Sequence, residues 1–353
     1  MGETTHFVSV SGGADSLAAM LLAIKRAEKR AMKLRFLNAN LGANESQITH
    51  DYIGYLEQAL SITIERMRAN FDAEFVKRRE TIQHHWSREK RRKEHSAECK
   101  ARREVLLPAE YRALCACPVR VSPAVPQEII DQAKALLIPT GEPFLDLCML
   151  KGRFPSRTAQ FCTERLKLEP INAITHPILE AGDNIVSWIG EMAEESPKRA
   201  AKPKMQRIRW PGEGGSLVLY RPIHSWTKAD NFALAKRHGI KPNALYQMGM
   251  GRVGCQPCIN CGKDELAQID QRFPEVIERI AVWQSIVAAV PRRQAATFFS
   301  GDAADPTKGD IRNAVEWAKT TRGGKQFDLL QRMRRDQADE EGAMCESAYG
   351  LCE

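Results

Sequence analysis

The chain has 353 residues, 43% of them hydrophobic, so it can bury one large core or two smaller ones, and its composition excludes a wholly disordered protein. No apolar run reaches the roughly 18 residues of a membrane span, and residues 1–9 lack the pattern of a secretion signal. We therefore expect a soluble cytoplasmic protein, in which the 10 cysteines serve metal or thiol chemistry rather than disulfides.

The start of the chain has the pattern of an α/β fold. Phe7, Val8 and Val10 predict a buried strand, a glycine turn follows, and residues 17–24 have apolar positions at helical spacing. Further strands are predicted at 34–39, 184–189 and 217–223, and a helix at 49–60. Strands that alternate with helices predict a doubly wound, mostly parallel sheet, with the ligand beyond the carboxyl ends of its strands.

Residues 71–147 interrupt this pattern and are interpreted as a helical, basic insertion in an α/β domain of residues 1–260. A long polar helix is predicted over 71–103 and a short one near 127–137. Residues 77–103 carry 11 Lys and Arg against 4 Glu, a charge of +7 out of a total of +8. This segment fits nucleic acid as a partner and fits a solvated helix equally well.

Residues 261–353 are predicted to form a helical C-terminal region that carries a cysteine metal site. One helix starts near Pro274, where proline suits the first turn, and another covers 311–320. Residues 301–309 are predicted to be a loop and 332–341 a charged, flexible stretch.

The turn after the first strand has the sequence Ser11-Gly12-Gly13-Ala14-Asp15-Ser16. A strand, a glycine turn and a helix bring backbone N–H groups and the helix N-terminus to one point, which suits phosphate oxygens. Ser11 and Ser16 can donate hydroxyls, and Asp15 can hold Mg²⁺ or cap the helix. A plain glycine turn with a capping Asp is the alternative.

The cysteine spacing indicates metal chemistry at two places. Cys255, Cys258 and Cys261 form a C-x2-C-x2-C run, as in iron–sulfur sites, although zinc uses the same thiolates. A fourth ligand would be needed, and the tail supplies Cys345 and Cys352.

A second metal site is an open possibility in the insertion. His95 and Cys99 lie four residues apart, with Cys115 and Cys117 downstream, but a solvated helix explains the first pair more simply. Cys162 is either a nucleophile or a small buried residue, and we favour the buried residue.

Several motifs over residues 7–260 resemble the PP-loop families: phosphoadenosine phosphosulfate (PAPS) reductases, ATP-dependent sulfur-inserting enzymes and the enzymes of DNA phosphorothioation. Beyond the glycine turn, the motifs are Phe161-Cys162-Thr163 with Leu166-Lys167, Glu195-Ser196 with Arg199, Pro222-Ile223, Trp226-Thr227, Asn243, Leu245-Tyr246, Gly249 and Arg252-Val253-Gly254-Cys255. The resemblance implies a site for ATP or PAPS with Mg²⁺, in which Asp15, Ser16, Lys167 and Arg199 are catalytic. It implies that the nucleotide is contacted by Ser11, Gly12, Gly13, Asp15, Ser16, Glu45, Lys167, Glu195, Ser196 and Arg199.

The sequence departs from the family pattern at three places. Asn40-Leu41-Gly42 replaces Asp-Thr-Gly before Glu45, and Gly190-Glu191-Met192 lacks the cation of Gly-x-Arg. The end of the chain reads Gly350-Leu351-Cys352-Glu353 and lacks the attacking-cysteine segment of the dedicated reductases. It resembles the tail of phage PAPS-reductase-like proteins, which implies a [4Fe-4S] cluster on Cys255, Cys258, Cys345 and Cys352, with Cys261 as the chief rival and zinc as the alternative metal.

Three functions are compatible with these observations. The first is an ATP pyrophosphatase that activates a nucleic-acid or small-molecule substrate for sulfur transfer, with a sulfur donor such as a cysteine desulfurase. The second is a thiol-dependent PAPS or adenosine phosphosulfate (APS) reductase that releases sulfite. The third is a nucleotide-sensing, nucleic-acid-binding defence subunit.

Overall fold

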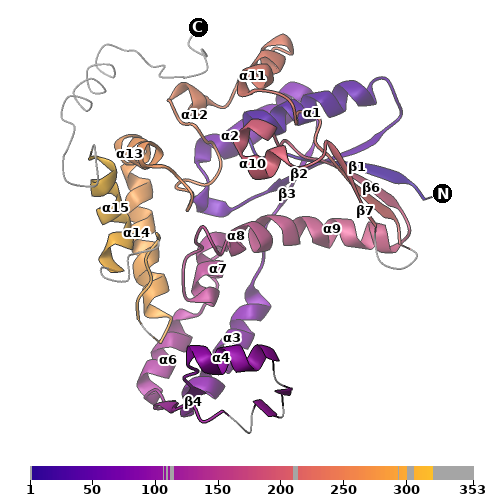
Figure 1. The fold of residues 1–353 in the computed structure, drawn as a ribbon. Helices are drawn as coiled ribbons and strands as arrows, with labels where there is room; N and C mark the ends of the chain where they lie inside the picture. Colours follow the sequence, from indigo (N-terminus) through magenta and orange to yellow (C-terminus); the bar gives the residue numbers. More distant parts are fainter. Residues whose placement is uncertain are drawn as a thin grey trace.

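The computed structural model describes residues 2–105, 107–108, 110–111, 115–209, 214–292, 294–299 and 306–320. Its centre is a six-stranded sheet with the order β3-β2-β1-β6-β8-β7 (Figure 1). All neighbouring strands are parallel except β7, which pairs antiparallel with β8. The strands are β1 (Thr4–Ser9), β2 (Lys33–Ala39), β3 (Ile64–Met67), β6 (Asn184–Trp188), β7 (Met205–Arg209) and β8 (Ser216–Tyr220).

Helices cover both faces of the sheet, which confirms the predicted doubly wound α/β class (Figure 1). One face packs against α1 (Ala14–Ala27), α2 (Gln47–Leu60) and α11 (Lys228–Arg237). The other face packs against α9 (Glu169–Glu180). Because successive strand residues point to opposite faces, Val8 belongs to the first core and Phe7 to the second.

The sheet has its switch point between β1 and β6. The chain runs from β1 outward through β2 and β3, and then crosses to β6 and β8 on the other side of β1. Ligands of such sheets bind in the crevice at the carboxyl ends of the two central strands. The loops that follow β1 and β6 both begin at this edge, which positions the site described below.

A second body of helices has the largest core of the described residues. It contains the aromatic cluster of Phe144, Phe154, Trp283 and Phe298, whose ring centroids lie 5.4 to 6.3 Å apart. The helices are α3 (Asp72–Trp86), α6 (Gln127–Leu136), α7 (Pro143–Lys151), α13 (Lys263–Arg272), α14 (Pro274–Ala289) and α15 (Ile311–Ala318). The helices of the predicted insertion therefore share a core with the C-terminal helices, and the domain division at residue 260 stays a prediction.

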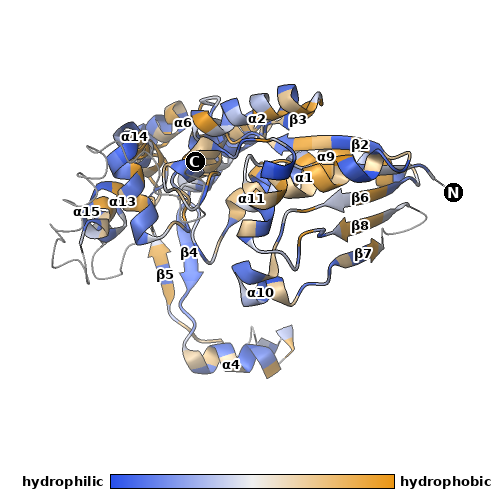
Figure 2. Ribbon diagram, turned by 90° about the horizontal axis from the view of Figure 1, so that it is seen from above, coloured by the Kyte–Doolittle hydropathy of each residue, from blue (hydrophilic) through white to orange (hydrophobic). Residues whose placement is uncertain are grey.

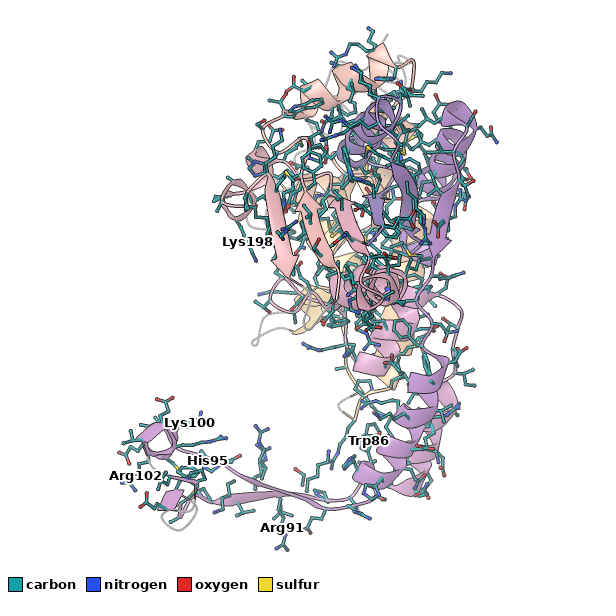
Figure 3. All side chains as sticks on the ribbon, turned by 90° about the vertical axis from the view of Figure 1, so that its right-hand side faces the viewer. Trp86, Arg91, His95, Lys100, Arg102 and Lys198 are labelled. Carbon is teal, nitrogen blue, oxygen red and sulfur yellow. The ribbon has the colours of Figure 1, made fainter. Side chains whose placement is uncertain are left out.

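The predicted long helix over 71–103 is wrong. α3 ends at Trp86, and the chain continues through β4 (Lys90–Lys93), α4 (Ala97–Val105) and β5 (Val119–Ser122). β4 and β5 pair antiparallel, so the partner of β4 lies far along the chain, where local periodicity gives no sign of it. We call residues 88–122 the arm; it extends away from the body at the end of α3 (Figure 3).

The remaining predicted elements lie within a few residues of observed ones. β3 and β7 were not predicted, and the predicted loop 301–309 ends in the 3-10 helix η4 (Pro306–Gly309). The predicted flexible stretch 332–341 lies outside the described residues. The short elements around the site are η1 (Gly42–Asn44), α8 (Phe161–Thr163), the π-helical turn η2 (Glu164–Leu168), η3 (Ala193–Glu195), α10 (Pro197–Ala200) and α12 (Ala244–Gln247).

Candidate nucleotide-binding site and cysteine group

The phosphate loop joins β1 to α1 and needs glycine for two reasons. Gly12 has a φ of +72°, and a Cβ there would lie 2.7 Å from Thr49 Cγ2. Gly13 occupies the N-cap position of α1 and brings no side chain to cap the helix. The positive end of the helix dipole therefore faces the loop, as anion binding requires.

The two serines of the loop hold its shape. Ser16 Oγ donates to Gly13 O at 2.9 Å and accepts from the Ser11 N–H at 3.1 Å. The hydroxyl groups of Ser11 and Ser16 are 3.1 Å apart. Both hydroxyls lie in the same turn, and hydrogen bonds from them to a phosphate stay a prediction.

Asp15 does not cap α1, contrary to one of its predicted roles, because its carboxylate is held by side chains of α11. Lys228 Nζ lies 3.0 and 3.1 Å from its two oxygens, and Asn231 Nδ2 donates to Oδ1 at 2.8 Å. The Lys228 N–H donates to Glu194 Oε1 at 2.9 Å, in the loop after β6. The start of α11 therefore links the loops of both central strands.

Sequence reasoning missed Lys228. The sequence indicates this residue through the Trp226-Thr227 motif. Thr227 caps α11 by accepting from the Asp230 N–H, so Lys228 is the first residue of the helix and lies at the site. The Lys228 ammonium also lies 5.5 Å from the centre of the Tyr246 ring, and Tyr246 Oη accepts from the Ala14 N–H at 3.1 Å.

A second set of hydrogen bonds supports the loop from behind. Asn243 Nδ2 lies 3.3 Å from Gly12 O and 3.2 Å from Thr49 Oγ1. Thr49 Oγ1 in turn donates to Val253 O at 2.6 Å. The Asn243 and Arg252–Cys255 motifs therefore lie directly against the phosphate loop, where they connect it to the cysteine run.

Glu45 and Lys167 lie on the cysteine side of the site. Glu45 is buried, accepts from the Leu41 N–H at 3.3 Å and pairs through its backbone with Cys255. Burial raises the pKa of its carboxyl group, against the opposing charge of Lys167. The negative charge of a Cys255 thiolate is the main cause that raises the pKa of Lys167. Burial of the lysine lowers this pKa, and the charge of Glu45 raises it again.

The thiols of Cys162, Cys255 and Cys258 interact electrostatically with one another and with Lys167. Cys162 is half-buried in this group, so the interpretation of it as a merely buried residue was incomplete. Burial raises the pKa of Cys255 to about 12 and that of Cys261 to about 12. Thiols from two segments beside an ammonium group fit an anionic, thiolate-ligated metal centre.

Cys345 and Cys352 lie outside the described residues, so their part in a cluster with Cys255 and Cys258 stays a prediction. The Cys261 N–H donates to Cys258 O at 2.9 Å, in the tight turn that the C-x2-C-x2-C spacing predicts.

The Glu195-Ser196-x-x-Arg199 motif forms a capped turn. Ser196 Oγ accepts from the Arg199 N–H at 3.3 Å at the start of α10, and the Arg199 guanidinium pairs with Glu195. Arg199 also lies 3.6 Å from Glu191, the residue before Met192, which stands where the family pattern has a cation. Glu191 is further paired with Lys202 at 2.5 Å and Arg221 at 2.7 Å.

A glycine loop at the switch point of a mostly parallel, doubly wound sheet defines a nucleotide-binding, PP-loop-like protein. The model of the phosphoadenosine phosphosulfate reductase domain family matches residues 5–261, so the chain belongs to that family.

Two relatives differ greatly in how much of the chain they cover. The "uncharacterized 37.8 kDa protein in gpa 5'region" of Escherichia phage 186 is 41% identical over 99% of this chain and 97% of its own length. The adenosine 5'-phosphosulfate reductase of Allochromatium vinosum is 31% identical over 33% of this chain and 43% of its own length.

Similar solved structures are distant. The phosphoadenylyl-sulfate reductase of Candida auris, a phosphate complex, has a TM-score of 0.36 and 10% identity, over 72% of this chain and 82% of that chain. The FMN adenylyltransferase of Candida glabrata, with FAD and inorganic pyrophosphate, has a TM-score of 0.34 and 10% identity, over 72% of this chain and 55% of that chain. In the described part of the chain, no helix has the length and apolar character to cross a membrane.

Proposed function

We propose that this protein is an ATP pyrophosphatase that activates a nucleic-acid or small-molecule oxygen for replacement by sulfur. The observation that carries the proposal is the arm. Its described residues expose nine cations, and its tip lies on the same side of the molecule as α10, which follows the loop after β6 (Figures 2 and 3). The cations are Arg88, Lys90, Arg91, Arg92, Lys93, Lys100, Arg102, Arg103 and Arg120.

A polyanionic acceptor explains this arm better than a small nucleotide alone does, because a mononucleotide would be held within the crevice of the sheet. β4 is hydrophilic along its length (Figure 2), and all four of its residues are exposed. A two-stranded ribbon of this kind fits the major groove of a nucleic-acid duplex. Nucleic acid is therefore the acceptor class that we favour.

The phosphate loop would hold the leaving group. Backbone N–H groups at the start of α1 and the hydroxyls of Ser11 and Ser16 would stabilise the negative charge on the departing phosphates. Asp15 would bind Mg²⁺ in exchange for Lys228, and the metal would neutralise phosphate charge. Lys167 and Arg199 would supply fixed cations at the two sides of the loop.

The reaction would proceed in two displacements. An acceptor oxygen attacks the α-phosphorus of ATP, a new P–O bond forms, and the bond to the β-phosphate breaks with release of pyrophosphate. A sulfur nucleophile at the oxidation level of hydrosulfide then attacks the activated atom, and AMP leaves with the oxygen. A persulfide from a cysteine desulfurase would need two further electrons from a thiol.

A metal centre on Cys255, Cys258, Cys345 and Cys352 would hold or deliver the sulfur, as a [4Fe-4S] cluster or, alternatively, with zinc. Truncation after Glu341 should then abolish the bound iron, and Cys261→Ser should spare it. Iron analysis of anaerobically purified protein measures both variants. Full iron in the truncated protein, or its loss in Cys261→Ser, would make Cys261 the ligand instead.

The second candidate is a thiol-dependent PAPS or APS reductase that releases sulfite, and the similarity to the A. vinosum enzyme favours it. Two assays separate the candidates: AMP and pyrophosphate formation from ATP–Mg²⁺ with duplex DNA or RNA, and sulfite release from PAPS or APS with dithiothreitol. Sulfite release without pyrophosphate formation would overturn the proposal. Nucleotide binding without turnover in either assay would favour a nucleotide-sensing subunit.

A further inference from the structure

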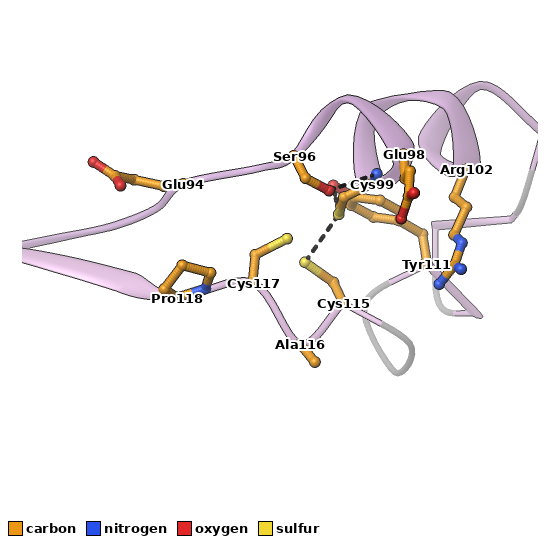
Figure 4. A pocket seen from close by; sticks show the side chains of 10 residues that line it. All are labelled: Glu94, Ser96, Glu98, Cys99, Arg102, Tyr111, Cys115, Ala116, Cys117 and Pro118. Carbon is orange, nitrogen blue, oxygen red and sulfur yellow. Dashed lines mark hydrogen bonds between the residues drawn. The ribbon is translucent and has the colours of Figure 1, made fainter.

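Four potential metal ligands meet at the tip of the arm. The ligand atoms of His95, Cys99, Cys115 and Cys117 all lie within 4.8 Å of one another. Cys99 Sγ is 3.3 Å from His95 Nδ1 and 3.4 Å from Cys115 Sγ, and Cys115 Sγ is 3.5 Å from His95 Nδ1. Figure 4 shows the three thiols turned toward one pocket, and Figure 3 places His95 at the tip.

These spacings fit one tetrahedral metal ion. Zinc bonds of about 2.3 Å to sulfur and 2.0–2.1 Å to nitrogen give tetrahedral edges of about 3.8 Å between sulfurs and about 3.6 Å between sulfur and nitrogen. The three separations among His95, Cys99 and Cys115 are within a few tenths of an ångström of those edges, and Cys117 Sγ lies within 4.8 Å of the other three ligand atoms. Elsewhere in the described residues, no three His, Cys or carboxylate ligand atoms gather this closely.

Among the described residues of the tip, no apolar core is present that would otherwise hold it together. Of the nine residues of α4, Cys99 alone is buried, and Val105 is 85% exposed. On β5, Val119 and Val121 are about half exposed. A two-stranded ribbon is marginal by itself, and small units of this kind take their ordering free energy from disulfides or metals.

Neighbouring side chains and backbone groups hold the four ligand residues in position. Tyr111 Oη lies 3.3 Å from Cys99 Sγ, to which it can donate, and the Cys99 N–H donates to Ser96 Oγ at 3.1 Å. Lys93 Nζ donates to Cys115 O at 3.1 Å, and the Glu94 N–H donates to Pro118 O at 2.9 Å, which ties both sides of the tip together. Such contacts orient the ligands of a metal site.

We propose that His95, Cys99, Cys115 and Cys117 bind one structural Zn²⁺ that holds the tip of the arm in its folded shape. A donor set of three thiolates and one imidazole without carboxylates selects zinc, and four protein ligands close the site to substrate. Three thiolates and Zn²⁺ leave a net charge of −1 beside the cations of the arm. From sequence we favoured a solvated helix for His95 and Cys99, and under this proposal they are metal ligands instead. The site is independent of the proposed reaction and of the Cys255 group.

The test compares matched cysteine pairs in the full-length protein. Wild-type protein purified with zinc supplied should hold one equivalent of zinc at the arm, and Cys115→Ser with Cys117→Ser should lose it. Cys255→Ser with Cys258→Ser should retain it, whatever happens to any iron. Unchanged zinc in the first pair, or zinc lost only in the second pair, would overturn the proposal.

A second measurement needs no variant. A zinc chelator applied to the wild-type protein should raise tryptic cleavage within 88–103 at least tenfold and leave the body intact, and added Zn²⁺ should reverse this. Cobalt exchange should produce the visible bands of tetrahedral cobalt thiolate. Cleavage that the chelator does not change, together with no such bands, would show that the tip folds without metal.

Discussion

Lys228 Nζ lies 3.0 Å from Asp15 Oδ1, and the two side chains are only 19% and 18% exposed. The pair connects the first turn of α11 with the first turn of α1, although 213 positions separate the residues in the chain. Removing one charge of a largely buried pair costs more than removing both, because the remaining charge loses its partner in a poorly solvated place.

The first prediction follows from this pair. Asp15→Ala should lower the free energy of unfolding by about 1–3 kcal/mol, and Lys228→Met in the Asp15→Ala background should restore part of the loss. Urea unfolding of the four proteins of this cycle measures the coupling. Both variants with Asp15→Ala should also lose most pyrophosphate release from ATP, because the loop acid is gone. Full turnover in Asp15→Ala would contradict the assignment of the phosphate loop.

The second prediction concerns Gly190, where the loop after β6 crosses the phosphate loop. A Cβ there would lie 2.6 Å from the carbonyl carbon and oxygen of Asp15 and 2.7 Å from Ser16 N. Since the three nearest atoms are all backbone atoms, which cannot rotate away, the loops must separate, at about 1–3 kcal/mol. Gly190→Ala should therefore weaken both stability and ATP affinity, as read by urea unfolding and calorimetric titration.

Gly54→Ala is the matched control. Gly54 lies within α2, and a Cβ there would meet nothing within 4 Å. Alanine is favoured over glycine in a helix by roughly 0.5–1 kcal/mol, so this variant should be neutral or more stable, with normal ATP affinity. Equal stability and equal ATP affinity of the two variants would mean that the close approach of the loops at Gly190 does not matter for either property.

The parts of the fold that were predictable from sequence depend on local pattern. β1, the glycine turn and α1 follow one another directly, so a short apolar run, glycine and helical spacing identify all three. β4 could not be identified in this way, because its pairing partner β5 lies beyond α4, and its own sequence of four basic residues has no apolar alternation. For Lys228 the start of its helix has a local signal at Thr227, but the contact with Asp15 spans 213 positions and has no sign in the local pattern.

The third prediction concerns the pH dependence of stability at Glu191. Burial alone would raise its pKa, but hydrogen bonds from Lys202 and Arg221 outweigh burial and lower it. A lowered folded-state pKa adds stability above the unfolded value of about 4.3, and this contribution is lost as the pH falls through the folded value. Denaturation curves should therefore show Glu191→Gln less stable than wild type at pH 7, with the difference shrinking below about pH 4.

Glu278→Gln provides the comparison. Glu278 pairs with Arg312 on the surface, where the two side chains are 63% and 59% exposed, and exposed pairs contribute little. Its unfolding curves should stay close to wild type at both pH values. An equal effect of the two substitutions would show that the cations around Glu191 add nothing specific to the fold.

The last prediction concerns the arm and its polyanionic partner. Each phosphate contact lowers the slope of log K against log salt by about 0.9 for duplex DNA, so replacement of three contacting cations by Ala should flatten that slope by about 2–3. Arg88, Lys90 and Arg92 are the suitable cations, because Arg91 is paired with Glu89 and Lys93 holds the Cys115 carbonyl. Anisotropy of a labelled duplex DNA or RNA between about 50 and 200 mM NaCl gives the slope.

A control variant with the same change in charge separates the arm from net charge. Lys25, Lys29 and Arg30 are exposed around the C-terminal end of α1, at the edge of the sheet opposite the phosphate loop. Their replacement by Ala should leave the slope nearly unchanged, because cations far from the bound polyanion release no counterions from it. Equal slopes for the two triple variants would show that the arm acts only through the net charge of the protein. Absence of binding by the wild-type protein at low salt would exclude nucleic acid from the proposed function.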